Sequence, residues 1–174
     1  MRRNRKAQYI FYKTYFQMLY AIAFRYTREP EDAMDMVNLG FAKVMLNLAK
    51  YDNNKSLEKW MKTIVINTII DEFRKHKKYK EYTALVDEET ITYLAGQTEG
   101  TWFKGEALEA IQLKLKELPL LTAQVFNLYA VDGYKHKEIA EMLGIPEGTS
   151  HWHYSAAKKS LRQHLKVTLN YQAS

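Results

Sequence analysis

Apolar side chains recur every three or four residues along most of the chain, and this spacing restricts the fold more than any other feature. Between about 8 and 27 the recurring positions are Phe11, Tyr15, Met18, Leu19, Ile22 and Tyr26. This spacing places them on one face of an α-helix. With only 7 Gly and 3 Pro among 174 residues, a turn-rich β fold is disfavoured. We therefore predict an all-α protein.

Two more helices are expected in the first part of the chain. Pro30 suits the first turn of a second helix, whose apolar stripe is Ala33, Val37, Phe41, Val44 and Leu48. Residues 51–56 read as a loop, and Ser56 as the N-cap of a third helix that runs to about Lys78.

The third helix has two contrasting faces when it is wound at about 100° per residue. The core face is predicted to hold Met61, Val65, Ile66, Ile69, Ile70 and Phe73. The opposite stripe holds Trp60, Thr63, Asn67, Asp71, Arg74 and Lys78. Such a stripe can stack on bases, bond their edges and hold phosphates. Alternatively, Trp60 covers the edge of the core and the other residues form a solvated face, and periodicity alone leaves both interpretations open.

Charge divides the chain into three segments. Residues 1–80 carry 17 Lys and Arg against 8 Asp and Glu, whereas residues 81–105 carry one Lys against 5 acidic residues. Residues 106–174 are nearly balanced, with 8 basic and 7 acidic residues. We predict two small helical domains, 1–80 and 106–174, joined by a flexible acidic linker, 81–105. The basic first domain hints at a polyanionic partner, although many solvated surfaces are also basic.

The second domain carries the spacing of a helix-turn-helix. A helix from about Ala107 is stopped by Pro119, Thr122 is predicted to cap the next helix, and that helix ends at Asp132-Gly133. A short helix over 135–143 and a long helix to about Lys166 follow. The helix-turn-helix pattern consists of Ile139, Ala140, Leu143, Gly144 and Ile145. An ordinary bundle of three helices is the alternative.

The same winding assigns two faces to the last helix. Tyr154, Ala157, Leu161 and Leu165 are expected on the buried side. His151, Trp152, Ser155, Lys159, Arg162 and Lys166 are expected to face outward. An outward Trp152, nearly opposite the core, can enter a DNA groove, stack on a partner or pack on the linker. His151 and His153 diverge by about 200° and cannot share a metal ion, so no metal site is predicted.

Several classes of protein are disfavoured by what the sequence lacks. Without cysteine there is no disulfide, thiolate nucleophile or Cys-ligated metal. No enzyme motif is present, so we expect neither an enzyme nor a cofactor. No apolar run approaches the roughly 18 residues of a membrane span. The basic start lacks the apolar stretch of a signal peptide, which predicts a cytoplasmic protein.

The motifs, taken in order, resemble a bacterial RNA polymerase sigma factor of the extracytoplasmic-function (ECF) group, over roughly 9–80 and 107–166. Residues 31–41 resemble its core-polymerase-binding helix, and residues 60–75 its promoter-melting helix. In the second domain Leu118-Pro119, Gly133-Tyr134, Glu138-Ile139-Ala140 and Glu147-Gly148-Thr149 follow its helix-turn-helix. The resemblance implies a factor that directs core RNA polymerase to specific promoters and promotes DNA melting. The alternatives are a helix-turn-helix regulator that acts without polymerase and a protein whose first domain binds only protein.

The resemblance also implies roles for individual residues. Core polymerase would be bound by Asp32, Asp35, Asn38 and Phe41. The melted minus-10 element would meet Tyr51, Asn53, Trp60, Asn67, Asp71, Arg74, Lys75 and Lys78. The duplex minus-35 element would meet Thr149, His151, Trp152, His153, Ser155, Lys158, Lys159 and Arg162. An anti-sigma factor is a further expected partner, and the bacterial cytoplasm is the expected location.

The sequence departs from the family pattern at three places. Asn38, Leu39 and Gly40 stand where Gln-Glu-Thr is common, and Pro146 occupies a position usually held by a capping Ser or Thr. The stretch that includes His151, Trp152, His153 and Ala156 replaces one usually richer in Lys, Ser and Arg. We therefore expect either unusual promoter specificity or a partner that docks at Trp152.

Overall fold

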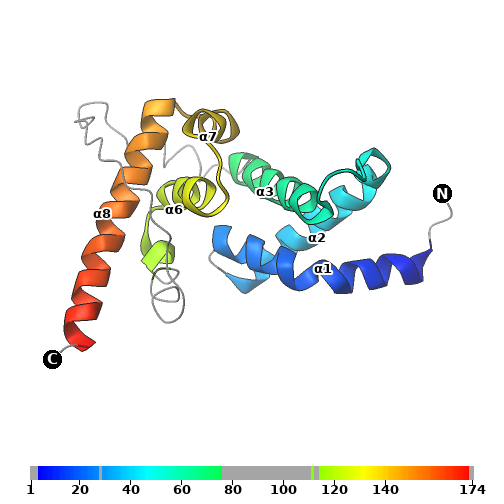
Figure 1. Cartoon of the computed structure of the whole chain (residues 1–174), viewed down its shortest axis with the longest axis horizontal. Helices are drawn as coiled ribbons and strands as arrows, with labels where there is room; N and C mark the ends of the chain where they lie inside the picture. The colour runs from blue at the N-terminus through cyan, green and yellow to red at the C-terminus, as the bar shows by residue number, and fades with distance from the viewer. Residues whose placement is uncertain (1–3, 28, 76–110, 112–113, 173–174) are drawn as a thin grey trace. The chain divides into compact units, whose positions relative to one another are not determined.

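The computed structural model describes residues 4–27, 29–75, 111 and 114–172, with side chains up to residue 164. Within these ranges the chain forms helices, turns and loops but no strand, which confirms the all-α prediction (Figure 1). The chain divides into two compact units, Met1–His76 and Lys77–Ser174. The predicted linker, the side chains of Leu165 and Lys166, and Lys78 lie outside the described residues. The helix expected from Ala107 is described only at Ile111 and over 114–117.

In its described residues the first unit has α1 (Arg5–Tyr26), α2 (Pro30–Asn47) and α3 (Leu57–Lys75), with a 3₁₀ turn, η1 (Leu48–Lys50), after α2. Pro30 stands in the first turn of α2, as expected. The Ser56 Oγ accepts a hydrogen bond from the Lys59 N–H at 3.3 Å, which confirms Ser56 as the N-cap of α3. Local capping signals therefore set where α2 and α3 begin.

The core of the first unit is built from one face of each helix. Its buried apolar residues are Leu19, Ile22, Ala23, Tyr26, Ala33, Val37, Val44, Met61, Val65, Ile66, Ile69 and Ile70. Helices α2 and α3 approach closely at Gly40, because a Cβ placed there would lie 2.9 Å from the Val65 Cγ2. The predicted core face of α3 is confirmed, except that Phe73 is only half-buried.

The second unit contains α6 (Leu120–Phe126), a π-helical turn η3 (Asn127–Val131), α7 (His136–Leu143) and α8 (Glu147–Gln172). The prediction that Thr122 caps a helix is wrong. Helix α6 begins two residues earlier, after Pro119, and the Thr122 side chain is buried inside the unit. Its hydroxyl lies 2.9 Å from the His153 Nδ1, so a tertiary contact uses the group that was expected to cap the helix.

Helices α7 and α8 form a helix-turn-helix, as predicted. Gly144 ends α7 with φ 66°, a left-handed conformation that favours glycine. The Ile145 N–H donates to the Ala140 carbonyl at 3.1 Å, which closes the turn. Ile139, Leu143 and Ile145 are buried beneath it. The turn thus fixes the start of α8 relative to α7.

Candidate functional site

The outer face of α2 carries exposed acidic and apolar side chains. Asp32, Asp35 and Asn38 are exposed, and the Asn38 Oδ1 accepts a hydrogen bond from the Tyr12 hydroxyl at 2.9 Å. Phe41 is half-buried, with its ring centroid 4.9 Å from that of Tyr12 in an edge-on contact. Asp32, Asp35 and Asn38 can therefore meet a partner directly, whereas Phe41 mainly joins α2 to α1.

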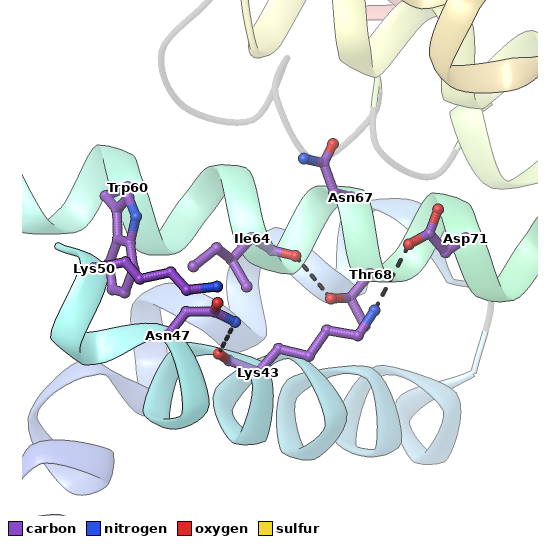
Figure 2. Close-up of a pocket in the computed structure, with 8 residues that line it drawn as sticks. All are labelled: Lys43, Asn47, Lys50, Trp60, Ile64, Asn67, Thr68 and Asp71. Carbon is purple, nitrogen blue, oxygen red and sulfur yellow. Dashed lines mark hydrogen bonds and ion pairs between the residues drawn. The ribbon is translucent and has the colours of Figure 1, made fainter.

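An open pocket of about 360 Å3 lies between α2 and α3 (Figure 2). It is lined by Lys43, Asn47, Lys50, Trp60, Ile64, Asn67, Thr68 and Asp71. Figure 2 shows Lys50 beside Trp60 at one end and an ion pair at the other, with the Lys43 Nζ 3.6 Å from the Asp71 Oδ2. The volume falls within the range of small-molecule sites, about 300 Å3 and above.

Three of the predicted minus-10 residues, Trp60, Asn67 and Asp71, meet in this pocket. Sequence reasoning missed the contributions of Lys43, Asn47, Lys50, Ile64 and Thr68. Lys43 and Asn47 of α2 and Lys50 of η1 follow one another at steps of four and three, the spacing of one helical face. That signal was present in the sequence, but only the packing of α2 on α3 reveals which face closes the pocket.

The loop that precedes α3 is ordered by its own hydrogen bonds. The Asp52 Oδ1 accepts from the backbone and side-chain nitrogens of Asn54 at 3.0 and 3.1 Å. The Tyr51 hydroxyl donates to the Lys55 carbonyl, and the Tyr51 ring lies 5.2 Å from that of Trp60. Trp60 is therefore half-buried against the loop. Asn53 is exposed at the tip.

Beyond the pocket, the end of α3 is exposed and basic. Arg74 and Lys75 are both exposed. The Lys75 Nζ donates to the Glu72 Oε1 at 2.6 Å, and this hydrogen bond raises the pKa of Lys75. Part of the positive charge at this end is thus matched within the helix.

On α8, most of the predicted contact residues are accessible. His151, Ser155, Lys159 and Arg162 are exposed, and Thr149 is half-buried. Lys158 is half-buried, with its Nζ 4.6 Å from the centre of the Tyr154 ring. Burial and the nearby Arg162 lower the pKa of Lys158.

His153 does not lie on this exposed surface of α8. Its side chain is 3% exposed, and its Nδ1 lies 2.9 Å from the Thr122 hydroxyl. Burial lowers the pKa of His153 to about 4, so the ring is neutral near pH 7. A buried ring cannot reach a base edge, and the expectation that His153 contacts DNA does not fit this geometry.

Trp152 also departs from its expected position nearly opposite the core. It is half-buried, with its ring edge-on to that of His153 at 4.8 Å. Tyr154 is half-buried instead of fully buried. The buried face of α8 is formed by Ser150, His153, Ala157 and Leu161. Both α6 and α7 pack on α8, and the buried arc is therefore centred differently from the one that the apolar residues predict.

The described part of the chain also bears on two other functions, metal binding and membrane insertion. Among the residues that the structure describes, no three His, Asp or Glu side chains are grouped so as to hold a metal ion. Within the same ranges, none of the helices is both long and apolar enough to cross a membrane.

Fold and surfaces together define an all-helical protein with a polar pocket in one unit and a helix-turn-helix in the other. Residues 11–79 match the family model of Sigma-70 region 2, and residues 108–161 match that of Sigma-70, region 4. The chain is 30% identical over 128 residues to the RNA polymerase sigma factor SigV of Bacillus subtilis (strain 168). The matched region covers 74% of this chain and 72% of that protein.

Two further similarities agree with this match. The ECF RNA polymerase sigma factor SigW of Bacillus subtilis (strain 168) is 26% identical over 159 residues, covering 87% of this chain and 85% of that protein. The sigma factor RpoE of Bartonella quintana, solved in complex with the anti-sigma factor NepR, has a similar fold, with a TM-score of 0.54 and 19% identity over 90% of this chain and 94% of that one. The chain belongs to the RNA polymerase sigma factors, in their ECF group. It is a transcription initiation factor, and a regulator that acts without polymerase is not favoured.

Proposed function

We propose that residues 1–80 dock on core RNA polymerase and bind the melted minus-10 element, while residues 106–174 read the minus-35 element as duplex. Residues 81–105 would link the two domains. The observation that carries this division is the pocket between α2 and α3, because it places an aromatic ring, two amides, two lysines and an aspartate around one open cavity.

The pocket has the chemistry to take an unpaired base. Trp60 offers a ring for stacking, a contact worth about 1–3 kcal/mol per base. The Asn67 amide both donates and accepts, so it can bond the edge of a base. Lys50 supplies positive charge for a phosphate, whereas Lys43 is paired with Asp71 in the free protein. Because a base exposes all of its edges only outside the duplex, such a pocket favours a melted strand.

The exposed face of α2 supports a docking role on polymerase. Asp32 and Asp35 present carboxylates to solvent, and Met34 and Leu39 are 39% and 37% exposed beside them. A mixed face of acidic and apolar side chains suits a protein partner better than DNA, because carboxylates repel phosphates. We assign it to a coiled coil of the largest polymerase subunit.

Three further assignments accompany this function. The chain would catalyse no reaction itself, since the chemistry of RNA synthesis belongs to the polymerase. It would act in the bacterial cytoplasm, where it meets core polymerase and DNA. An anti-sigma factor would regulate it by covering the same docking and DNA-binding faces.

Reconstitution with core polymerase tests the proposal. The purified chain should bind core polymerase and initiate transcripts on genomic fragments. Asn67→Ala should slow promoter opening about tenfold, the loss expected for hydrogen bonds left unmade at a buried base, and should leave core binding intact. Gln17→Ala, which alters an exposed amide of α1 outside the pocket, is the matched control. A chain that shifts duplex DNA but neither binds core nor initiates would show that the proposal is wrong.

A further inference from the structure

Three aromatic rings from three elements of the second unit stack on one another. The Tyr129 ring of η3 lies 4.2 Å from that of His136, centroid to centroid and tilted by only 19°. The His136 ring lies in turn 3.8 Å from that of His151, tilted by 32°. His136 is 7% exposed in the first turn of α7, whereas the His151 side chain on α8 is 59% exposed. One side of an exposed ring is therefore covered by a buried one.

His136 is itself fixed from two further directions. Its Nδ1 lies 2.9 Å from the Ser150 Oγ, and Ser150 directly precedes His151 on α8. Tyr129 covers the ring face that does not meet His151. A side chain held by stacking on both faces and by a hydrogen bond has little rotamer freedom left. The His151 ring, which stacks on this fixed side chain, is restricted in turn.

The charges around the stack favour a neutral His136. Burial, the nearby His151 and Lys158 together lower the pKa of His136 to about 4. Two other polar residues lie near the stack: the Tyr154 ring centroid is 5.8 Å from that of His136, and the Glu147 Oε1 is 3.9 Å from the His151 Nε2. At neutral pH the rings of His136 and His151 can therefore stack without repulsion between two cations.

We propose that His136 is a positioning residue for promoter recognition, which holds the ring of His151 so that its exposed edge meets a base edge in the major groove. The inference rests on the proposed function, in which α8 reads duplex DNA. An imidazole edge can bond the N7 or O6 acceptors of a purine. Because the ring is ordered before binding, its rotamer entropy is not lost in the complex, which improves discrimination by about threefold to tenfold.

The test uses full-length chain in holoenzyme and a promoter library randomised over the upstream element. His151→Ala identifies the base position that this residue reads. His136→Ala should reduce discrimination at that same position by about threefold to tenfold. The double variant should be no worse than His151→Ala, since a residue that acts only through another adds nothing once that one is gone. His136→Phe, which keeps a ring for stacking, should recover most of the loss.

His153→Ala is the matched control, because His153 is also a buried histidine bonded to a hydroxyl at 2.9 Å. It should leave discrimination at the His151 position unchanged. In NMR spectra of the free chain, His136→Ala should shift the ring protons of His151, since it removes a stacked ring, and His153→Ala should not.

Two results would overturn the inference while leaving the proposed function intact. One is a holoenzyme that selects its promoter but shows no base position dependent on His151. The other is a pair of effects, from His136→Ala and His151→Ala, that simply add. A chain that neither binds core polymerase nor selects a promoter overturns the proposed function, and this inference with it.

Discussion

Acidification should unfold the second unit of the chain before the first. The second unit buries two histidines, His136 and His153, and each ring is held by a hydroxyl group at 2.9 Å. Burial lowers the pKa of both rings from 6.5 to about 4. The first unit contains one histidine, His76, which is its last residue, and residues 4–75 contain none. A fall from pH 7 to pH 5 therefore changes proton binding mainly in the second unit.

The sign and size of the effect follow from proton linkage. Between pH 6.5 and 4 these histidines bind protons in the unfolded chain and not in the folded one, so stability is complete above pH 6.5 and is lost as the pH falls. From pH 7 to pH 5 the loss is about 2 kcal/mol for each histidine and about 4 kcal/mol for both. Small domains are stable by only about 5–15 kcal/mol, so this loss removes between about a quarter and four fifths of the margin.

Urea unfolding followed by two-dimensional NMR at pH 7 and pH 5 measures this directly. The amides of Gly133 and Gly144 report on the second unit, and that of Gly40 reports on the first. Exchanging both histidines for glutamine, which hydrogen-bonds without titrating, should abolish most of the difference between the two pH values. The reasoning is refuted if the second unit loses less than about 1 kcal/mol, or if the glutamine variant keeps the full loss.

Three shorter predictions concern packing, capping and DNA binding. Gly40→Ala should destabilise the first unit by about 1–3 kcal/mol in urea unfolding, because the new methyl group would press on Val65; an unchanged midpoint would mean that α2 and α3 separate freely. Ser56→Ala should cost about 1 kcal/mol by the same assay, with Ser56→Asp restoring stability by capping the helix again. Trp152→Ala should alter the footprint over the upstream element. An unchanged footprint would mean that Trp152 serves in packing or in binding a protein partner instead.

Helix positions were predictable because their signals are local. Pro30 and Ser56 begin helices where the sequence places them, and Gly144 ends one with a positive φ. Each signal depends on backbone geometry within one turn, so it needs no knowledge of the tertiary structure. The capping prediction for Thr122 is wrong because its side chain instead contacts His153, which is 31 residues away in the sequence.

The pocket could be predicted only in part. On the α3 side, the contrast between apolar and polar faces placed Trp60 and Asn67 on one stripe, and only the family resemblance gave that stripe a role in binding. Lys43 belongs to α2 and Lys50 to η1, and neither was assigned to a site from the sequence. Periodicity assigns a face to each helix but does not say which polar face lies beside which. A site made by two helices therefore appears only after their packing is known.

The departures of this sequence from the family pattern have their largest consequence on α8, the helix proposed to read duplex DNA. In the stretch that is usually richer in Lys, Ser and Arg, the two histidines differ in exposure. His153 is buried, whereas the His151 side chain is 59% exposed. Lys158 lies over the Tyr154 ring, so Lys159 and Arg162 are the exposed cations on the described face of α8. This face thus offers few cations for phosphates, and we expect the electrostatic part of its proposed duplex binding to be weak. If α8 reads the duplex as proposed, we expect promoter selection to depend on well-positioned base contacts and on the raised local concentration that polymerase would provide by holding the first unit.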